Sequence, residues 1–444
     1  MARTLRARAC HAGCEIRTLD LRQLTHFAAV FAAQVMRFSG ARVRSCPHCS
    51  MGLHLLRRAP LHILADVAFH DPAKSRLPLS RRFLRHPGRR ASSASAMASS
   101  VVKKVSGLSF PFQTPDPFLF AVYHNDAYPP GDEQMRAPRR GNGADFDPSA
   151  PYRMYHGERV PGFPQHPHRG FETITATMDG IVDHTDSLGN AGRYGHGDVQ
   201  WMTAGKGIVH GEMFPLVHMD RHNNLQLFQI WLNLPASKKM VDPAFVMHWA
   251  PKVESATSPD GGTKAVVWAG ELMGAKGQAP PPDSWAADPS NDVAVWFLTV
   301  RPGSSFALPP AAGGSGTNRS LYFFDGEGCV VAGRAVTSKS AIELDAGQSA
   351  EISVPASASA PALLLVLQGR PIGEPVAQHG PFVMNTRQEI QQAFSDYQRT
   401  QFGGWPWPED AVTFPRDKGR FALVGGKEEA GPGGVAGLRG HVEL

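Results

Sequence analysis

The chain has 444 residues, which leaves room for about two to four domains at roughly 100 to 200 residues each. Hydrophobic residues make up 42% of it and charged residues 19%, a composition typical of a globular protein. No stretch approaches the roughly 18 consecutive apolar residues that a membrane-spanning helix needs. The composition therefore excludes an integral membrane protein.

The formal net charge of the chain is +6, and the excess of positive charge comes from its first 100 residues. Residues 1–100 hold 17 of the 45 Lys and Arg residues and only four acids, which gives them a charge of +13. The other 344 residues carry 28 bases and 35 acids, a charge of −7. Because the remainder is mildly acidic, we expect it to bind neither nucleic acid directly nor membranes.

Residues 1–96 are predicted to be a leader. Their Arg-rich, Ser-rich and acid-poor composition resembles an organellar transit peptide, which implies a mitochondrial or plastid location. If Met97 is the true start, the location is the cytoplasm or nucleus instead. Only Cys329 lies outside the leader, so disulfides do not build this fold and an intracellular, reducing compartment fits best.

Two cysteine pairs in the leader raise a zinc hypothesis, because paired thiolates at short spacing share a tetrahedral ion. They are Cys10-x3-Cys14 and Cys46-x2-Cys49. A processed or disordered leader with incidental cysteines is the favoured interpretation, since short motifs carry many false positives.

The pattern of the remaining sequence predicts two sets of β-strands. Residues 97–160 are rich in Pro, Gly and Asp and are predicted to be a wrapping segment with one or two strands. Residues 161–273 contain short apolar stretches between turn signals, which predicts an antiparallel β domain. After a stretch rich in Pro and Gly, residues 292–402 repeat this pattern as a second domain. The fold class is therefore all-β, with two antiparallel β-barrels or sandwiches.

A short helix is predicted near the end of the second domain. Thr386-Arg-Gln-Glu389 is a capping box, and apolar residues on one face follow it, so we expect a helix over 387–400. Residues 403–444 are rich in Gly, Pro and Trp, and we expect a flexible tail that is loosely ordered after Trp407.

Histidines concentrate in the first β domain. Nine lie between Tyr152 and His248, and none lies between Trp249 and Gln378. His166-Pro-His168 and His210-Gly-Glu212 each place two side chains on the same face of a strand, because side chains alternate with period two. Facing strands would bring these four into a shell of three nitrogens and one oxygen. Such a shell suits Fe(II), or another divalent metal such as Mn, Ni, Zn or Cu.

Glu172 and the remaining histidines of this domain do not share the spacing of the four proposed ligands. Glu172 follows His168 by four positions and is expected to face the barrel interior, as a fifth ligand or as a carboxylate that holds an imidazole. Six histidines lack such partner spacing and are expected at the surface or behind the ligands: His156, His184, His196, His218, His222 and His248.

Several strings of the sequence together resemble the pirin family of cupins. The first runs from Gly162 to Thr173 and the second from Gly197 to Met213, and they contain the two histidine motifs. Further matches are Gln229-Ile-Trp231-Leu-Asn233-Leu234, Lys239-Met-Val-Asp-Pro243 and Gln378-His-Gly-Pro-Phe-Val-Met-Asn-Thr386. A long insert from Tyr128 to Val160 departs from the family pattern.

The resemblance implies a bicupin of two β-barrel or jelly-roll domains, with one iron in the N-terminal barrel and a C-terminal barrel without metal. The family's metal ligands fall on His166, His168, His210 and Glu212, and Glu172 then lies behind them. Pirin-like proteins similar to quercetin 2,3-dioxygenases imply an enzyme that uses Fe(II), O2 and a small flavonol-like aromatic, with Glu212 as ligand and base. We expect a monomer.

Two further readings stay open. Pirin resemblance also implies an iron-binding transcriptional co-regulator that senses redox state, docks on a protein partner and has no turnover. A metal with a purely structural role is the third. For the enzyme, hydrophobic side chains are expected to wall the substrate site, although such residues more often fill a barrel core. These residues are Phe171, Trp201, Met202 and Phe214.

Overall fold

The structure, a computed structural model, describes residues 101–140, 146–147, 149–337 and 339–433. The leader, its cysteine pairs and the start at Met97 lie outside the described residues. Those described belong to one structural unit, residues 87–444. Among the described residues, no helix is both long and apolar enough to cross a membrane.

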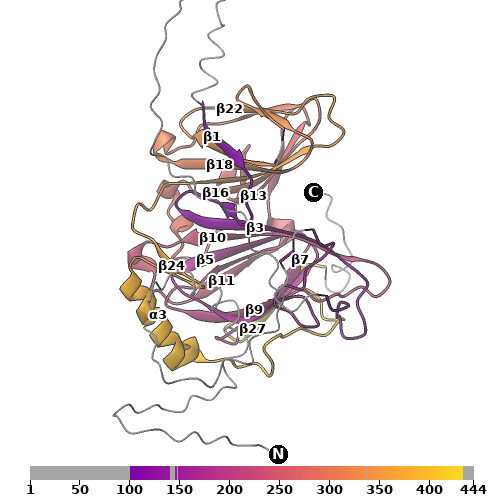
Figure 1. Cartoon of the computed structure of the whole chain (residues 1–444), viewed down its shortest axis with the longest axis vertical. Helices are drawn as coiled ribbons and strands as arrows, with labels where there is room; N and C mark the ends of the chain where they lie inside the picture. Colours follow the sequence, from indigo (N-terminus) through magenta and orange to yellow (C-terminus); the bar gives the residue numbers. More distant parts are fainter. Residues whose placement is uncertain (1–100, 141–145, 148, 338, 434–444) are drawn as a thin grey trace, which may run out of the picture. The chain divides into compact units, whose positions relative to one another are not determined.

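Two six-stranded antiparallel sheets form the N-terminal barrel (Figure 1). The first sheet has the order β11-β8-β5-β10-β3-β2 and the second β27-β26-β7-β6-β9-β4. The strands of the first sheet are β2 (Phe112–Gln113), β3 (Phe118–Tyr128), β5 (Phe171–Asp179), β8 (Val199–Thr203), β10 (Asn223–Asn233) and β11 (Ala244–His248). Those of the second are β4 (Gly162–His168), β6 (Ile181–Asp186), β7 (Ala191–Gly195), β9 (Ile208–Met213), β26 (Phe421–Val424) and β27 (Lys427–Ala430).

The C-terminal barrel pairs a seven-stranded sheet, β1-β21-β18-β23-β16-β13-β12, with a four-stranded one, β17-β22-β19-β20. The seven strands are β1 (Val102–Gly107), β12 (Ser255–Thr257), β13 (Thr263–Ala269), β16 (Ala294–Val300), β18 (Asn318–Asp325), β21 (Ser340–Asp345) and β23 (Ala362–Gly369). The four are β17 (Ser305–Leu308), β19 (Cys329–Val331), β20 (Arg334–Val336) and β22 (Ala350–Ser353).

Hairpins and short helices complete the described elements. The hairpins pair β14 (Glu271–Leu272) with β15 (Ala275–Lys276) and β24 (Ala377–His379) with β25 (Phe382–Met384). The 3-10 helices are η1 (Ala236–Lys238), η2 (Ala250–Lys252), η3 (Trp285–Ala287), η4 (Pro289–Asn291), η5 (Gly314–Gly316) and η6 (Gln401–Gly403). The helix α3 (Arg387–Thr400) and its capping box between Thr386 and Glu389 confirm the predicted helix.

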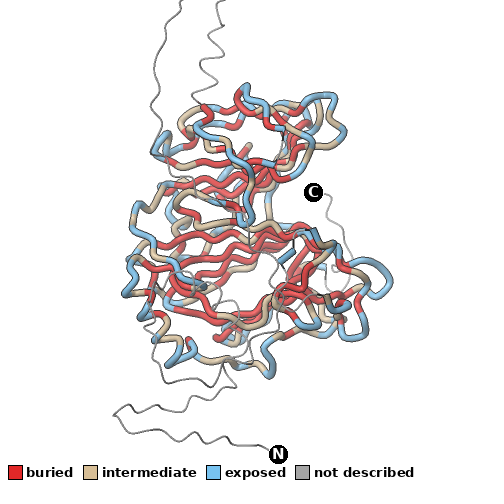
Figure 2. Tube along the Cα trace, in the orientation of Figure 1, coloured by how far each residue is buried: buried red, intermediate tan, exposed pale blue. Residues whose placement is uncertain are grey.

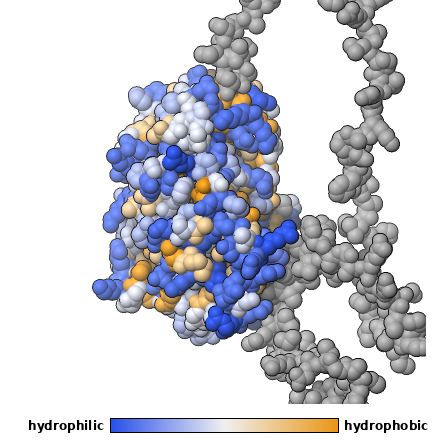
Figure 3. Space-filling view, turned by 90° about the vertical axis from the view of Figure 1, so that its left-hand side faces the viewer, coloured by the Kyte–Doolittle hydropathy of each residue, from blue (hydrophilic) through white to orange (hydrophobic). Residues whose placement is uncertain are grey.

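The large sheets of the two barrels pack against each other through apolar outer faces. The cluster between them joins Ile174, Trp201 and Phe228 of the first barrel with Phe297 and Leu365 of the second. The strands at the interface between the barrels are buried along most of their length (Figure 2), because their sheets have a filled interior on one side and the other barrel on the other. Strands of the four-stranded sheet, such as β17 and β22, instead alternate buried and more exposed residues. The face in Figure 3 is mostly hydrophilic, with scattered hydrophobic residues.

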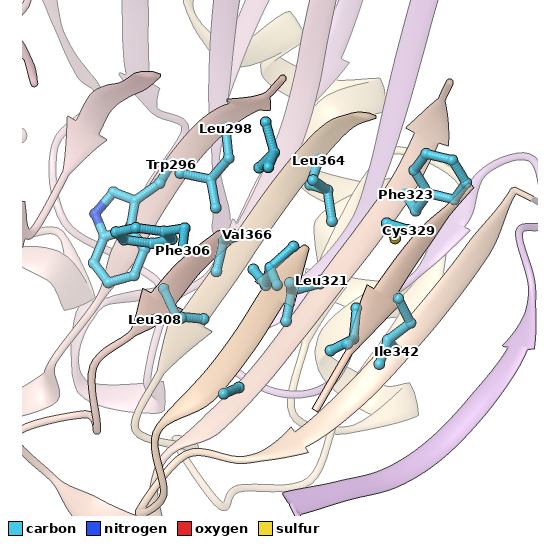
Figure 4. Close-up of a cluster of buried hydrophobic side chains, with 14 of the residues drawn as sticks. Trp296, Leu298, Phe306, Leu308, Leu321, Phe323, Cys329, Ile342, Leu364 and Val366 are labelled. Atoms are coloured by element: carbon cyan, nitrogen blue, oxygen red, sulfur yellow. The ribbon is translucent and has the colours of Figure 1, made fainter. Parts of the chain in front are cut away.

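The interior of the C-terminal barrel is filled with apolar side chains (Figure 4). Trp296, Leu298, Leu321, Leu364 and Val366 point into one cluster from neighbouring strands. The thiol of Cys329 lies in the same cluster, where burial raises its pKa to about 11. Each fully buried Leu or Phe of this kind stabilises a fold by about 1.5 to 3 kcal/mol.

The sheets divide the chain differently from the boundaries expected from sequence. β1 of the wrapping segment pairs with β21 of the C-terminal barrel, whereas β3 pairs with β10 of the N-terminal barrel (Figure 1). β12 and β13 lie before residue 273 but join the C-terminal barrel through β16. Chain order alone does not reveal such crossings, because the strands that pair are far apart in sequence.

The segment expected to be a flexible tail also differs, since β26 extends the second sheet of the N-terminal barrel by pairing with β7. The buried Arg193 guanidinium donates hydrogen bonds to the carbonyl oxygens of Phe414, Pro415 and Lys418. Its remaining donors pair with Asp183 at 2.6 and 2.8 Å. The order comes from this long-range anchor, which the local composition of Gly, Pro and Trp does not reveal.

Candidate metal centre

Two neighbouring strands bring the histidine motifs together. β4 pairs antiparallel with β9, and the register places His166 directly opposite His210. The register shifts between Phe163 and His166, so β4 is bulged just before the first histidine. His166 and His168 alternate along β4, and both rings reach His210.

Three imidazoles form one cluster. The ring centres of His166 and His210 are 4.4 Å apart, those of His166 and His168 4.7 Å, and those of His168 and His210 4.8 Å. One ring nitrogen from each lies within 4.8 Å of the others. His168 and His210 are buried, whereas His166 is partly exposed. We call these residues the imidazole triad.

The hydrogen bonding of the triad leaves nitrogen atoms free for a ligand. His166 Nδ1 lies 2.9 Å from the Pro164 carbonyl oxygen, so it carries the proton and leaves Nε2 as a lone-pair donor. Within the described part of the chain, neither ring nitrogen of the buried His210 has a hydrogen-bond partner, nor does Nδ1 of His168. Buried polar atoms without partners are costly, and a divalent cation would satisfy them. The residues present therefore fit a metal.

Burial keeps the triad in the form that binds metal. Desolvation lowers the pKa of His166, while the Pro164 carbonyl opposes the shift. Desolvation also holds the pKa of His168 and His210 well below the usual value, helped by the neighbouring imidazoles. Neutral imidazole is the species that donates a lone pair to a metal, so the triad is prepared for one.

The carboxylate of Glu212 lies beside the triad but outside its 4.8 Å cluster. Its Oε2 is 4.0 Å from His210 Nε2 and accepts a hydrogen bond from Gln229 Nε2 at 2.8 Å. Its Oε1 accepts from the Thr175 hydroxyl at 3.1 Å and the Tyr194 hydroxyl at 3.5 Å. The carboxylate is thus held by three neutral donors next to the imidazole that has no partner.

Glu172 does not face the triad, contrary to the expectation from sequence. Its buried carboxyl group accepts hydrogen bonds from Thr203 Oγ1 at 2.6 Å and Ser284 Oγ at 2.5 Å, on the side of the sheet that faces the other barrel. Gly170, at a φ of +85°, breaks the chain into β4 and β5, so strand alternation does not carry across. Burial raises the pKa of Glu172 to about 7.

A buried lysine fixes that turn. Lys239 Nζ donates to the carbonyl oxygens of Gly170 and Val383 at 2.8 and 3.1 Å and to Asn233 Oδ1 at 2.7 Å. Val383 also donates its N–H to the Arg169 carbonyl oxygen, directly after His168. The motif strings around Lys239 and Val383, far apart in sequence, therefore meet at the end of the strand that carries His166 and His168.

His184, expected at the surface or behind the ligands, lies inside the barrel behind His210. It is fully buried, and its ring centre is 5.5 Å from that of His210. Neither of its ring nitrogens has a hydrogen-bond partner among the residues that the structure describes. The nearest carboxylate is Asp186, at 3.7 Å from Nε2. The spacing His184-x-Asp186 repeats that of His210-x-Glu212, and this signal in the sequence could have identified it.

The other histidines stay away from the triad. His196 and His248 are buried rather than at the surface, and their ring nitrogens lie 3.1 Å from Asp179 Oδ1 and 3.0 Å from the Ala279 carbonyl oxygen. His196 also lines a surface pocket with His218 and His222, and no member of the triad lines it. His156 is partly exposed beside Phe163.

The aromatic walls only partly match those expected. Phe171 lies against His168, with ring centres 5.0 Å apart, and stacks on Trp231 at 4.0 Å. Trp231 is itself 5.2 Å from the His168 ring and was missed as a wall residue. Trp201 instead packs between the barrels, because it lies on the outer face of β8. Met202 and Phe214 belong to other buried clusters of the N-terminal barrel.

A pair of antiparallel β-barrels, one of which carries imidazoles on its inner face, defines this chain as a bicupin. The family model Pirin matches residues 113–232, and the model Pirin C-terminal cupin domain matches residues 295–403. The chain belongs to the pirin family of the cupin superfamily.

Individual relatives agree with this assignment. A pirin-like protein from Solanum lycopersicum is 38% identical over 241 residues, which cover 53% of this chain and 75% of the relative. Pirin from Homo sapiens is 34% identical over 267 residues, 58% of this chain and 83% of that protein. A crystal structure of quercetin 2,3-dioxygenase from Acinetobacter baumannii superposes with a TM-score of 0.52 at 27% identity, covering 69% of this chain and 96% of that one.

Proposed function

We propose that this protein is an Fe(II)-dependent dioxygenase of the quercetin 2,3-dioxygenase type, acting on a flavonol-like aromatic compound. The observation that carries the proposal is the imidazole triad, whose buried His210 has no hydrogen-bond partner on either nitrogen among the described residues. His166, His168, His210 and Glu212 are the proposed ligands. When bound, iron would supply a Lewis acid for the substrate hydroxyl and the redox chemistry that O2 requires.

Glu212 is the proposed base for the substrate hydroxyl. Its carboxylate accepts hydrogen bonds from Gln229, Thr175 and Tyr194, which fix its orientation, and it has no Lys or Arg partner among the described residues. A carboxylate oriented in this way is positioned to take a proton from a substrate hydroxyl at hydrogen-bond distance. Phe171 and Trp231 offer flat apolar surface beside His168 for an aromatic ring.

The solved relative adds support at the level of chemistry. Quercetin 2,3-dioxygenase from Acinetobacter baumannii is 27% identical to this chain and is covered over almost its whole length. The proposed substrate and reaction are based on the name of this relative and on the proposed metal ligands of this chain, His166, His168, His210 and Glu212. The iron-binding co-regulator remains the alternative that the same experiment tests.

The test is metal analysis of the full chain purified without O2, followed by O2 uptake with quercetin. We expect about one iron per chain in the wild type, loss of iron in His166→Ala and Glu212→Ala, and uptake that depends on quercetin. Glu351→Ala, at an exposed position of the C-terminal barrel, is the control that should keep iron and activity. Iron without flavonol-dependent uptake would favour the co-regulator, and wild-type protein without metal would refute the site.

A further inference from the structure

Gln229 contacts the proposed base, Glu212, and is itself partly exposed. We propose that it is a positioning and specificity-determining residue: its amide N–H group holds Glu212, and its amide oxygen accepts a hydrogen bond from a second hydroxyl of the substrate. The preferred substrate class is then a polyhydroxylated aromatic compound rather than one with a single hydroxyl. This inference rests on the proposed function for the substrate, but not for the contact with Glu212.

The register of β10 directs Gln229 toward the barrel interior. Gln229 lies opposite Thr175 on β5 and Val122 on β3. Its Nε2 is 2.8 Å from Glu212 Oε2 and 3.5 Å from Thr175 Oγ1. The oxygen of Glu212 that it holds is the one that faces His210 Nε2 at 4.0 Å. Gln229 therefore determines which way that oxygen points.

The chemistry of the contact also fixes the other half of the amide. A carboxylate only accepts hydrogen bonds, so the NH2 group of Gln229 must face Glu212 and the amide oxygen must point elsewhere. Among the residues described, that oxygen accepts no hydrogen bond from the protein. A polar acceptor without a partner beside a catalytic carboxylate is suited to receive a donor from a ligand.

Partial exposure distinguishes Gln229 from the other groups around Glu212. The other two donors to Glu212, Thr175 and Tyr194, are buried, and so is Gln200 behind them. Gln229 is partly exposed although it points inward, and so are Val122 beside it and His166 of the triad. A substrate that reaches the triad from this side meets Gln229 together with Glu212.

The consequence is a preference for substrates with two or more hydroxyls. Glu212 would accept a hydrogen bond from one substrate hydroxyl, and the neighbouring Gln229 oxygen would accept one from a second hydroxyl. A site built to pair with a hydroxyl discriminates against an analogue that lacks it, because its own polar atom is then left unpaired. An aromatic compound with one hydroxyl should bind more weakly.

The experiment compares Gln229→Met with Gln226→Met in the full iron-loaded chain. Gln226 lies on the same strand, is also partly exposed, and bonds Asn125 instead of Glu212, so it is a matched control. Binding of quercetin and of 3-hydroxyflavone, which has one hydroxyl, is measured by fluorescence titration without O2. Iron retention against a chelator is measured in parallel, without substrate.

We expect the wild type and Gln226→Met to bind quercetin about tenfold tighter than 3-hydroxyflavone, and Gln229→Met to lose most of that preference. Iron should dissociate roughly 10-fold more readily from Gln229→Met, since Glu212 is then less well held. Unchanged preference and unchanged iron retention in Gln229→Met would overturn the inference and leave the proposed function intact. If the wild type binds neither flavonol, the proposed substrate fails, and iron retention alone decides whether Gln229 positions Glu212.

Discussion

The two barrels of this chain share an architecture and differ in what fills them. The C-terminal barrel encloses Trp296, Leu321, Leu364 and their apolar neighbours (Figure 4). The N-terminal barrel points His166, His168, His210 and the Glu212 carboxylate to the inside. The C-terminal interior is packed mainly with apolar side chains, whereas the N-terminal interior contains imidazole nitrogens that have no hydrogen-bond partner among the described residues.

The two interiors therefore have different roles: the C-terminal one contributes mainly stability, and the N-terminal one contains the candidate metal centre. Apolar side chains gain from burial without needing partners, so the C-terminal interior stabilises the chain by itself. Unpaired imidazole nitrogens cost stability until a cation binds them, so the N-terminal interior depends on its ligand. The apolar sheet faces between the barrels join both interiors into one unit.

The largest expected effect comes from removing an imidazole of the triad. His210→Ala should weaken metal binding by more than the 10- to 100-fold typical of changes behind the ligands, because a direct donor is lost. Metal content per chain, measured after dialysis, checks this. His248→Ala is the control, since that ring is also buried but bonds the Ala279 carbonyl oxygen, and it should keep the metal.

A cavity in the C-terminal barrel should lower stability and leave metal binding unchanged. Leu364→Ala removes a fully buried side chain from the C-terminal core and should lower the free energy of unfolding by about 2 to 5 kcal/mol. Urea denaturation measures the loss, and metal content per folded chain should not change. Val376→Ala, at an exposed position, should cost almost nothing. Loss of metal in Leu364→Ala would show that the interiors are not independent.

Glu172, between the barrels, should make stability depend on pH. Its pKa is raised by burial from 4.5 to about 7, so the native chain binds this proton more tightly than the unfolded chain. The associated stability is complete below about pH 4.5 and is lost as pH rises through about 7. Glu172→Gln cannot ionise, so its stability relative to wild type should rise by on the order of 3 kcal/mol between pH 4.5 and 8.

Urea midpoints of both proteins at pH 4.5, 6 and 8 test this. Metal content of Glu172→Gln should stay at the wild-type level, because its partners are Thr203 and Ser284 and not the triad. A difference in stability that does not vary with pH would contradict the assigned shift.

The smallest expected effect is at the helix that follows the second barrel. The Thr386 hydroxyl accepts a hydrogen bond from the Glu389 N–H, and the Glu389 carboxylate accepts one from the Thr386 N–H. Thr386→Ala should therefore lower the free energy of unfolding by about 1 kcal/mol. Thr386→Ser keeps the hydroxyl and should behave like wild type in the same urea experiment.

The sequence determined the features that depend on neighbours along the chain. Strand alternation indicated that His166 and His168 share a face, as do His210 and Glu212, and the structure brings the three imidazoles together. The capping box defined α3 from its first turn. Both are local patterns, because the period of a strand or a helix relates residues two to four positions apart.

The tertiary structure decided the features that depend on register and distant pairing. The turn at Gly170 put Glu172 on the outer face, and the crossing of β1 and β13 gave the C-terminal barrel strands from outside its expected domain. Only the pairing of β10 with β5 set Gln229 against Glu212, and only the long-range contacts of Arg193 ordered the tail. Such contacts join residues that the chain separates widely, and no local periodicity encodes them.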